Sequence, residues 1–270
     1  PLQNVDYDLG QWGPITRNGA LRDFVRMNLA AFELDDNDSA VDSQLEDYRV
    51  EEDVLAGYLM AQGTWGALRV TGGVRVEQTD FSAVGVQSLI DEIGGSGDPV
   101  FGLQHHDRSF TDVLPSIAVR YEVREDLVLR GGYARTLARP TFEAVAPYAA
   151  IEVTEDDGDI EREAELGNPN LDTLTADNLD LAIAWYPGDV AVLSAGLFYK
   201  RLKDFFVVSD VAGEPGPYVD FDEALTTLNG DTAELFGLEL NGVRQLDMLP
   251  APWNGLSLSA NLTLTDGEAT

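Results

Sequence analysis

The chain has 270 residues, of which 48 are acidic and 17 are basic, so its formal net charge is -31. A charge of this sign repels the phosphates of DNA and RNA, which argues against nucleic acid as a partner. The chain has no cysteine, which excludes disulfides and thiolate metal sites. Hydrophobic residues make up 44% of the chain, which favours a folded protein over a disordered one.

Residues 1–46 predict a polar, irregular segment with one helical patch. The apolar residues of this patch recur near helical spacing: Leu21, Phe24, Val25, Leu29 and Phe32. The patch ends at the acidic tract 33–42. We therefore expect a loop that carries a short helix. No apolar run reaches the length of a transmembrane helix, and the start of the chain shows no charged region followed by an apolar core, so no signal peptide is expected within it.

From about residue 48 onward, apolar and polar residues alternate with period two, which predicts β-strands with two distinct faces. The stretch 112–140 predicts two such strands joined by a tight turn near residues 124–126. The first strand presents Ile117, Val119 and Tyr121 on its apolar face, and the second presents Leu127, Leu129 and Tyr133.

About six further strands follow from the same alternation. They are expected near residues 54–62, 68–77, 178–185, 190–203, 236–241 and 256–265. In the first of these, Val54, Ala56, Tyr58 and Met60 share one face. Short turns near Gly63, Glu125, Pro187 and Pro250 alternate with long, irregular connections at 81–109, 139–176 and 205–229.

This alternation of short turns and long loops is typical of a transmembrane β-barrel, whereas a compact soluble domain seldom carries several long irregular loops. The fold class expected is therefore all-β, a partial antiparallel transmembrane barrel of about eight strands. The short turns would face the periplasm and the long loops the outside. The last residues read as a strand still in progress, so a fragment is expected.

An ordered series of motifs resembles the barrel domain of TonB-dependent outer-membrane receptors. The series comprises Arg135-Thr-Leu-Ala-Arg-Pro140, Gly167-Asn-Pro-Asn-Leu171, Asn178-Leu-Asp-Leu181, Gly196-Leu-Phe-Tyr-Lys200 and Asn229-Gly-Asp-Thr-Ala-Glu-Leu-Phe-Gly-Leu-Glu239. The resemblance covers about residues 48–270 and is nearest to large receptors tied to carbohydrate uptake.

The resemblance implies a barrel of about 22 strands in the bacterial outer membrane, closed by an N-terminal plug. Residues 47–270 would supply about eight of those strands, and residues 1–46 an extracellular loop with a short helix. The function implied is active uptake of a scarce nutrient, a carbohydrate or a siderophore-type ligand. The partners implied are outer-membrane lipid and lipopolysaccharide, the small nutrient, and the TonB energy-transducing complex. That complex acts through a plug and a box that are not recognisable in this chain.

Five arginines are candidate ligand-binding residues: Arg75, Arg120, Arg130, Arg135 and Arg139. By the resemblance, Arg135 and Arg139 lie where a strand leaves the membrane, and they could contact an anionic ligand or lipopolysaccharide phosphates. Alternatively, they end a strand and pair with local carboxylates. Arg75, Arg120 and Arg130 belong to a polar set expected to face the barrel interior, where it would line a substrate path or contact the plug.

The acidic run 152–165 contains a candidate calcium site at Glu155, Asp156, Asp157 and Asp159, since Ca²⁺ prefers clustered carboxylate oxygens. The alternative is a solvated acidic loop, because the spacing matches no EF-hand. No other cofactor is expected. His105 and His106 are adjacent, so on an extended chain they point opposite ways and do not form a chelating pair.

Two other function classes stay open at this point. A passive porin or structural outer-membrane barrel needs no plug, and a soluble all-β binding module would bury its apolar faces. Catalysis has no support, because the chain lacks a G-x-S-x-G elbow, an H-E-x-x-H pair and a phosphate-binding loop.

Overall fold

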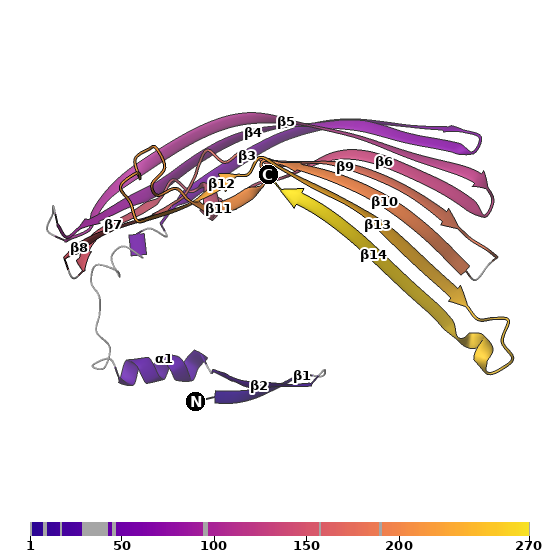
Figure 1. Ribbon diagram of the computed structural model, residues 1–270, viewed down its shortest axis with the longest axis horizontal. Helices are drawn as coiled ribbons and strands as arrows, with labels where there is room; N and C mark the ends of the chain where they lie inside the picture. The colour runs from indigo at the N-terminus through magenta and orange to yellow at the C-terminus, as the bar shows by residue number, and fades with distance from the viewer. Residues whose placement is uncertain are drawn as a thin grey trace. The chain divides into compact units, whose positions relative to one another are not determined.

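The computed structural model describes residues 2–7, 10–16, 18–28, 43–44, 47–93, 97–156, 158–188 and 191–269 (Figure 1). The chain divides into two compact units, Pro1–Ser43 and Gln44–Thr270. None of the described helices is both long and apolar enough to cross a bilayer.

The first unit contains a β-hairpin followed by a helix. Strands β1 (Leu2–Tyr7) and β2 (Gly10–Thr16) pair in antiparallel fashion, and helix α1 spans Asn18–Met27. The sequence predicts an irregular segment where the hairpin lies, so that expectation is wrong for these residues. Helix α1 covers the first part of the predicted helical patch, whereas Leu29 and Phe32 lie outside the described residues.

The second unit is built on one large sheet whose main strands pair with their neighbours in chain order. These strands are β3 (Arg49–Trp65), β4 (Leu68–Asp91), β5 (Val100–Arg124), β6 (Leu127–Ala138), β9 (Leu174–Trp185), β10 (Ala191–Lys203), β13 (Thr232–Gln245) and β14 (Ser257–Ala269). Every one of these neighbouring pairs is antiparallel. The all-β, partial-barrel fold class is therefore confirmed, and Figure 1 shows the sheet curling along its length.

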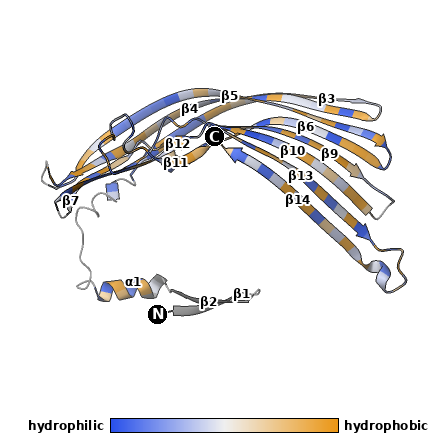
Figure 2. Ribbon diagram, viewed as in Figure 1, coloured by the Kyte–Doolittle hydropathy of each residue, from blue (hydrophilic) through white to orange (hydrophobic). Residues whose placement is uncertain are grey.

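The sheet has one mainly apolar face and one mainly polar face. Residues directly opposite each other in a strand pair lie on the same face, so each face can be followed from one strand to the next. On β9 the apolar face carries Leu179, Leu181, Ile183 and Trp185, and on β4 the polar face carries Arg69, Arg75 and Glu77. We call these the outward and inward faces. Figure 2 shows hydrophobic and hydrophilic residues alternating along β13 and β14.

Strand β3 departs from this division. Val54, Ala56, Tyr58 and Met60 lie opposite Thr79, Glu77, Arg75 and Gly73, so they share the inward face with polar residues. The outward face of β3 instead carries Leu55, Leu59 and Trp65, which lie opposite Gln78, Val74 and Leu68.

The long connections are not irregular, and this corrects the sequence-based expectation. Strands β4 and β5 extend through most of residues 81–109 as a tall hairpin. The next connection contains helix α3 (Phe142–Val145) and strands β7 (Ala149–Asp156) and β8 (Asp159–Leu166). Strands β11 (Phe206–Asp210) and β12 (Glu223–Asn229) lie in the third, and a 3-10 turn (Trp253–Gly255) precedes β14.

These extra strands extend the sheet beyond the end of β3. Strand β7 runs parallel to β4, with Gln87 opposite Ala149, and β12 runs parallel to β8, with Glu223 opposite Glu163. The strands in these connections thereby pair their backbone N–H and C=O groups with each other, whereas an irregular loop would leave those groups to water.

A small hydrophobic core lies on the inward face where the sheet is tallest. Phe81 and Ala83 of β4 pack with Val145 of α3 and with Leu171, and all four are buried. Val145 and Leu171 belong to two stretches, 139–148 and 167–173, which we call the cover. The stretches are joined by backbone hydrogen bonds from Gly167 N–H to Tyr148 O (3.0 Å) and from Asn168 N–H to Ala144 O (2.8 Å).

Candidate functional site

A cluster of opposite charges joins the cover to the inward face of the sheet. Arg139 donates to Glu77 Oε2 at 2.7 Å and to Thr79 Oγ1 at 3.3 Å, and its Nε lies 3.4 Å from Glu52 Oε1. Arg75 donates to the other oxygen of Glu77 at 2.6 Å. Glu77 is 7% exposed, and a carboxylate so far removed from water requires such charged donors.

The predicted site residues Arg75 and Arg139 therefore meet through Glu77, which lies on the same inward face of β4 as Arg75. Both guanidiniums are occupied by carboxylates. The cavity between the cover and the sheet has a volume of about 20 Å³. That space fits one water molecule at most, so this cluster stabilises the cover and offers no room for a ligand.

The 168–172 part of the cover is fixed to strand β12. Asn168 donates to Thr227 O at 2.9 Å, Asp172 N–H donates to Asn229 Oδ1 at 2.8 Å, and Asn229 donates to Asp172 O at 3.1 Å. The motif Gly167–Leu171 thus acts as a strap between two connections. Burial, with a smaller effect from the Glu165 carboxylate, raises the pKa of the Tyr148 phenol to about 12. Tyr148 therefore keeps its proton, which it donates to Glu165 at 3.2 Å.

Three arginines stand side by side across the inward face, near the short turns. Arg69 of β4 lies opposite Arg120 of β5, which lies opposite Arg130 of β6. We call these the arginine row. Arg120 pairs with Glu122, and Arg130 donates to the Tyr186 hydroxyl at 3.5 Å. Among the described residues, Glu122 is the one carboxylate that forms an ion pair with these three arginines, so the row carries more positive charge than its described surroundings compensate. Like charges directly opposite each other also destabilise a strand pair.

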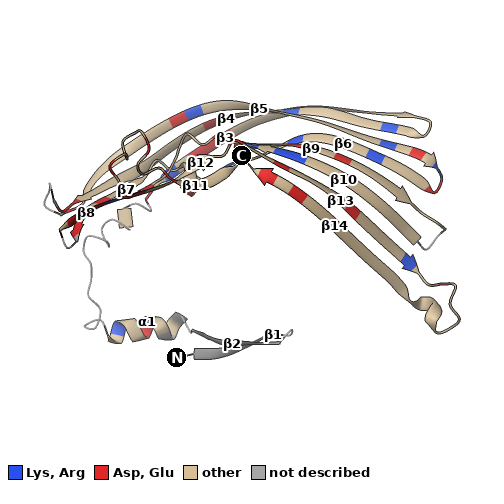
Figure 3. Cartoon of the chain, in the orientation of Figure 1, with Lys and Arg blue, Asp and Glu red and all other residues tan. Residues whose placement is uncertain are grey.

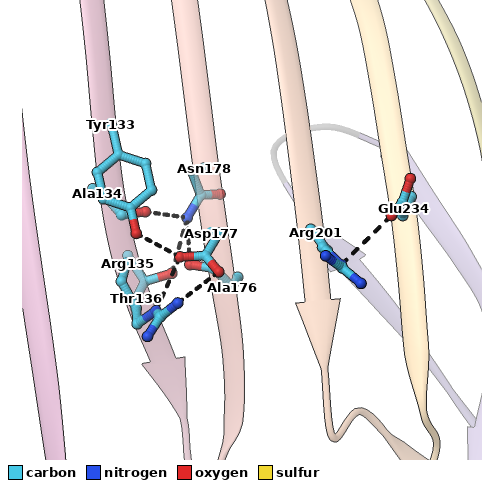
Figure 4. A network of polar contacts seen from close by, with 9 residues as sticks. All are labelled: Tyr133, Ala134, Arg135, Thr136, Ala176, Asp177, Asn178, Arg201 and Glu234. Carbon is cyan, nitrogen blue, oxygen red and sulfur yellow. Dashed lines mark hydrogen bonds and ion pairs between the residues drawn. The ribbon is translucent and has the colours of Figure 1, made fainter.

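Arg135 does not join Arg139, because it lies on the outward face of β6. Its guanidinium donates two hydrogen bonds to Asp177 of β9, from Nε at 2.9 Å and from Nη2 at 2.8 Å. The Tyr133 hydroxyl donates to the same carboxylate at 2.7 Å (Figure 4). Both Arg135 and Arg139 thus pair with local carboxylates, and ligand binding by either stays a prediction.

The Arg135–Asp177 pair begins a row of charges that crosses the outward face. Asp177 lies opposite Arg201 of β10, and Arg201 lies opposite Glu234 of β13, which its Nε approaches to 3.5 Å. One step toward the short turns, the matching positions are mainly aromatic, and the step after that is mainly aliphatic. The first level carries Tyr133, Leu179, Tyr199 and Phe236, and the second carries Gly131, Leu181, Leu197 and Leu238. From the water to the interior of a bilayer, the residues of such a barrel are first charged, then aromatic and then aliphatic.

The candidate calcium ligands lie at the tip of the β7–β8 hairpin. Glu155 is opposite Ile160 and Asp156 is opposite Asp159, while Asp157 lies outside the described residues. Calcium binding at this tip stays a prediction. Calorimetric titration with CaCl₂ of the full-length protein and of an Asp157→Asn, Asp159→Asn variant tests it.

His105 and His106 lie within strand β5, not in a flexible loop. They are opposite Val84 and Ala83, which occupy the two different faces of β4. The two imidazoles therefore point to opposite sides of the sheet, as expected for adjacent residues of a strand.

Comparison with known proteins agrees with the fold described above. The family model described as "TonB dependent receptor-like, beta-barrel" matches residues 2–270. No curated protein matches the chain by sequence. Among solved structures, the copper transporter OprC superposes with a TM-score of 0.56 at 14% identity, covering 82% of this chain and 30% of OprC. The ferric yersiniabactin uptake receptor FyuA from Yersinia pestis gives a TM-score of 0.52 at 16% identity, covering 83% of this chain and 28% of FyuA.

The sheet and the comparisons together define the wall of a β-barrel. The chain belongs to the TonB-dependent receptor β-barrel family. It spans less than a third of the length of these two similar structures.

Proposed function

We propose that the chain forms part of the wall of a bacterial outer-membrane receptor that takes up a scarce nutrient with energy supplied through TonB. The family match over residues 2–270 carries this proposal. In this arrangement the outward aliphatic positions face lipid, and the row from Arg135 to Glu234 lies at the level of the lipopolysaccharide head groups. Residues 47–270 contribute barrel strands, and residues 1–46 belong to an extracellular loop.

The ligand proposed is a small nutrient of the siderophore or carbohydrate type, taken up without chemical change. The similar structures named above are a copper transporter and a ferric yersiniabactin uptake receptor, which supports a metal-containing ligand. The energy partner would act through a plug and its box, in keeping with the family.

The arginine row is the part of the described inward face best suited to an anionic partner. We propose that Arg69, Arg120 and Arg130 contact an anionic group in the barrel interior, on the ligand or on an acidic protein segment. Support comes from the register, which sets three cations opposite one another with a single paired carboxylate, Glu122. A fourth arginine, Arg75, is already held by Glu77.

An uptake experiment tests the receptor function. Cells with the full-length gene and cells lacking it receive labelled ferric siderophores, copper or oligosaccharides, with and without a protonophore. We expect one ligand class to accumulate only in energised cells that carry the gene. Accumulation that survives the protonophore would instead establish a passive pore.

The same assay tests the arginine row. In the full-length protein, Arg120→Gln with Arg130→Gln should lower uptake about tenfold, because each removes a charge-assisted contact. Arg124→Gln is the matched control, since Arg124 lies outside the arginine row and pairs with Asp126 at 3.1 Å. Uptake that is unchanged in the double variant would contradict a role for the row.

A further inference from the structure

An apolar groove lies on the outward face near the short turns of β9, β10, β13 and β14. Its volume is about 480 Å³, within the range of small-molecule binding sites. Small residues deepen it at Ala195, Gly242 and Ala260, and larger ones flank it at Trp185, Leu193 and Leu262. Register places Trp185 opposite Leu193, Leu193 opposite Gly242, and Gly242 opposite Ala260, so the groove crosses four strands.

A single cation stands at the end of this groove. Arg244 lies on the outward face of β13, two residues beyond Gly242, and it is opposite Ala191 and Leu258. Figure 3 shows the basic segment at the end of β13, beside the turn to β14. No carboxylate pairs with Arg244 among residues 47–93, 97–156, 158–188 and 191–269, whereas the outward residues Arg135 and Arg201 pair with Asp177 and Glu234.

We propose that the groove and Arg244 form a binding site for one glycerophospholipid of the periplasmic leaflet. One acyl chain lies in the groove, and the phosphate accepts hydrogen bonds from the Arg244 guanidinium. The proposal rests on the proposed function, because that function places lipid against the outward face and the short turns at the periplasmic side.

The order of groups along the strands matches the order of groups in such a lipid. Two residues of a strand span about 7 Å, so Arg244 lies about that far beyond Gly242 of the groove. This spacing suits a lipid whose acyl chain lies in the groove and whose head group lies next to it. Guanidinium binds phosphate in a forked, charge-assisted geometry. Trp185, whose indole N–H donates to Asp126 Oδ2 at 2.8 Å, has the half-apolar, half-polar surroundings of an interfacial tryptophan.

Native mass spectrometry of the full-length protein in detergent, titrated with phosphatidylglycerol, tests the site. We expect a one-lipid adduct for the wild type and about a tenfold loss of that adduct in Arg244→Gln. Ala195→Leu, which fills the groove and keeps the charge, should also lose the adduct. Arg124→Gln is the matched control, because Arg124 is a paired arginine beside another short turn, and it should keep the adduct.

Three results would overturn the site. These are equal adducts in Arg244→Gln and wild type, equal loss in Arg124→Gln and Arg244→Gln, and equal binding of phosphate-free diacylglycerol. Folding of each variant is checked by its heat-modifiable electrophoretic mobility. Lipid retention is measured without transport, so a protein that keeps the adduct but shows no energised uptake would refute the proposed function alone.

Discussion

Asp177 accepts three hydrogen bonds on the outward face, two from Arg135 and one from Tyr133. Its side chain is 26% exposed, so water replaces these donors poorly. Asp177→Ala should therefore lower the free energy of unfolding of the full-length protein by about 1–2 kcal/mol. Glu234→Ala is the control: it breaks a longer, more exposed pair with Arg201, which is worth about 0–1 kcal/mol. Thermal unfolding followed by electrophoretic mobility measures both, and equal effects would contradict a special role for Asp177.

Gly167 shows why one position of the strap accepts no side chain. A Cβ there would lie 1.9 Å from Ala146 O and 2.8 Å from the Tyr148 ring, so the cover would have to shift. We expect Gly167→Ala to cost about 2 kcal/mol or more, as other overpacking changes do. Gly57→Ala, where a Cβ meets nothing within 4 Å, should stay within about 0.5 kcal/mol. A stable Gly167→Ala protein in the same unfolding assay would show that the cover is looser than described.

At the scale of elements, Asp210 closes the β11–β12 hairpin. Its Oδ1 accepts from Ala212 N–H and Ala224 N–H, each at 2.9 Å, and these bonds lower the pKa of the carboxyl group below its usual value. Because the folded pKa is depressed, the contribution of Asp210 is complete above the ordinary carboxyl pKa. It is lost as the pH falls through the folded value. Hydrogen exchange at the Ala212 and Ala224 amides should therefore be constant from neutral pH to about pH 5 and rise, after correction for intrinsic rates, below about pH 4. Asp210→Asn should remove this dependence, and an identical profile in the variant would assign it to another group.

The strands predicted from sequence are those in which one phase of alternation persists. Leu68, Val70, Val74 and Val76 keep apolar residues on the outward face of β4, and that half is predicted correctly. Above Val76 the phase reverses, since Phe81 and Ala83 face inward beneath the cover and Asp80 faces outward. A strand predicted from one continuous apolar face ends at such a reversal. Residues 81–109, at the far end of the β4–β5 hairpin, are therefore predicted as a loop.

The partners of the candidate residues were harder to predict than the residues themselves. Arg139 meets Glu77 from 62 positions earlier in the chain, and Arg135 meets Asp177 from 42 positions later. Alternation within a strand indicates which face a residue occupies, but only the register between strands indicates which residue it contacts.

Strand β8 is not predicted from the sequence for a different reason. Glu161, Glu163 and Glu165 share one face of an exposed hairpin, and in the sequence this pattern is typical of a solvated acidic run.

At the scale of the whole molecule, the two ends of the large sheet decide how this chain behaves by itself. In the part of the chain that the structure describes, β3 pairs only with β4 and β14 only with β13. Each therefore presents a long row of unpaired backbone donors and acceptors, which promotes edge-to-edge association. The outward face adds exposed apolar side chains over every main strand, including Leu59 (76% exposed), Leu197 (57%) and Leu258 (64%).

A polypeptide of residues 1–270 alone should therefore associate in aqueous buffer and need detergent to stay dispersed. The charge of -31 opposes association, but it acts only at the range of the Debye length, about 10 Å in 0.1 M salt, and cannot cover the apolar face. Size-exclusion chromatography with light scattering, with and without detergent, measures this. Leu262→Lys with Leu264→Lys on edge strand β14 should reduce the association in buffer, because charges on an edge strand block pairing. A dispersed monomer without detergent would mean that the apolar face is buried in some other way, as a soluble all-β module requires.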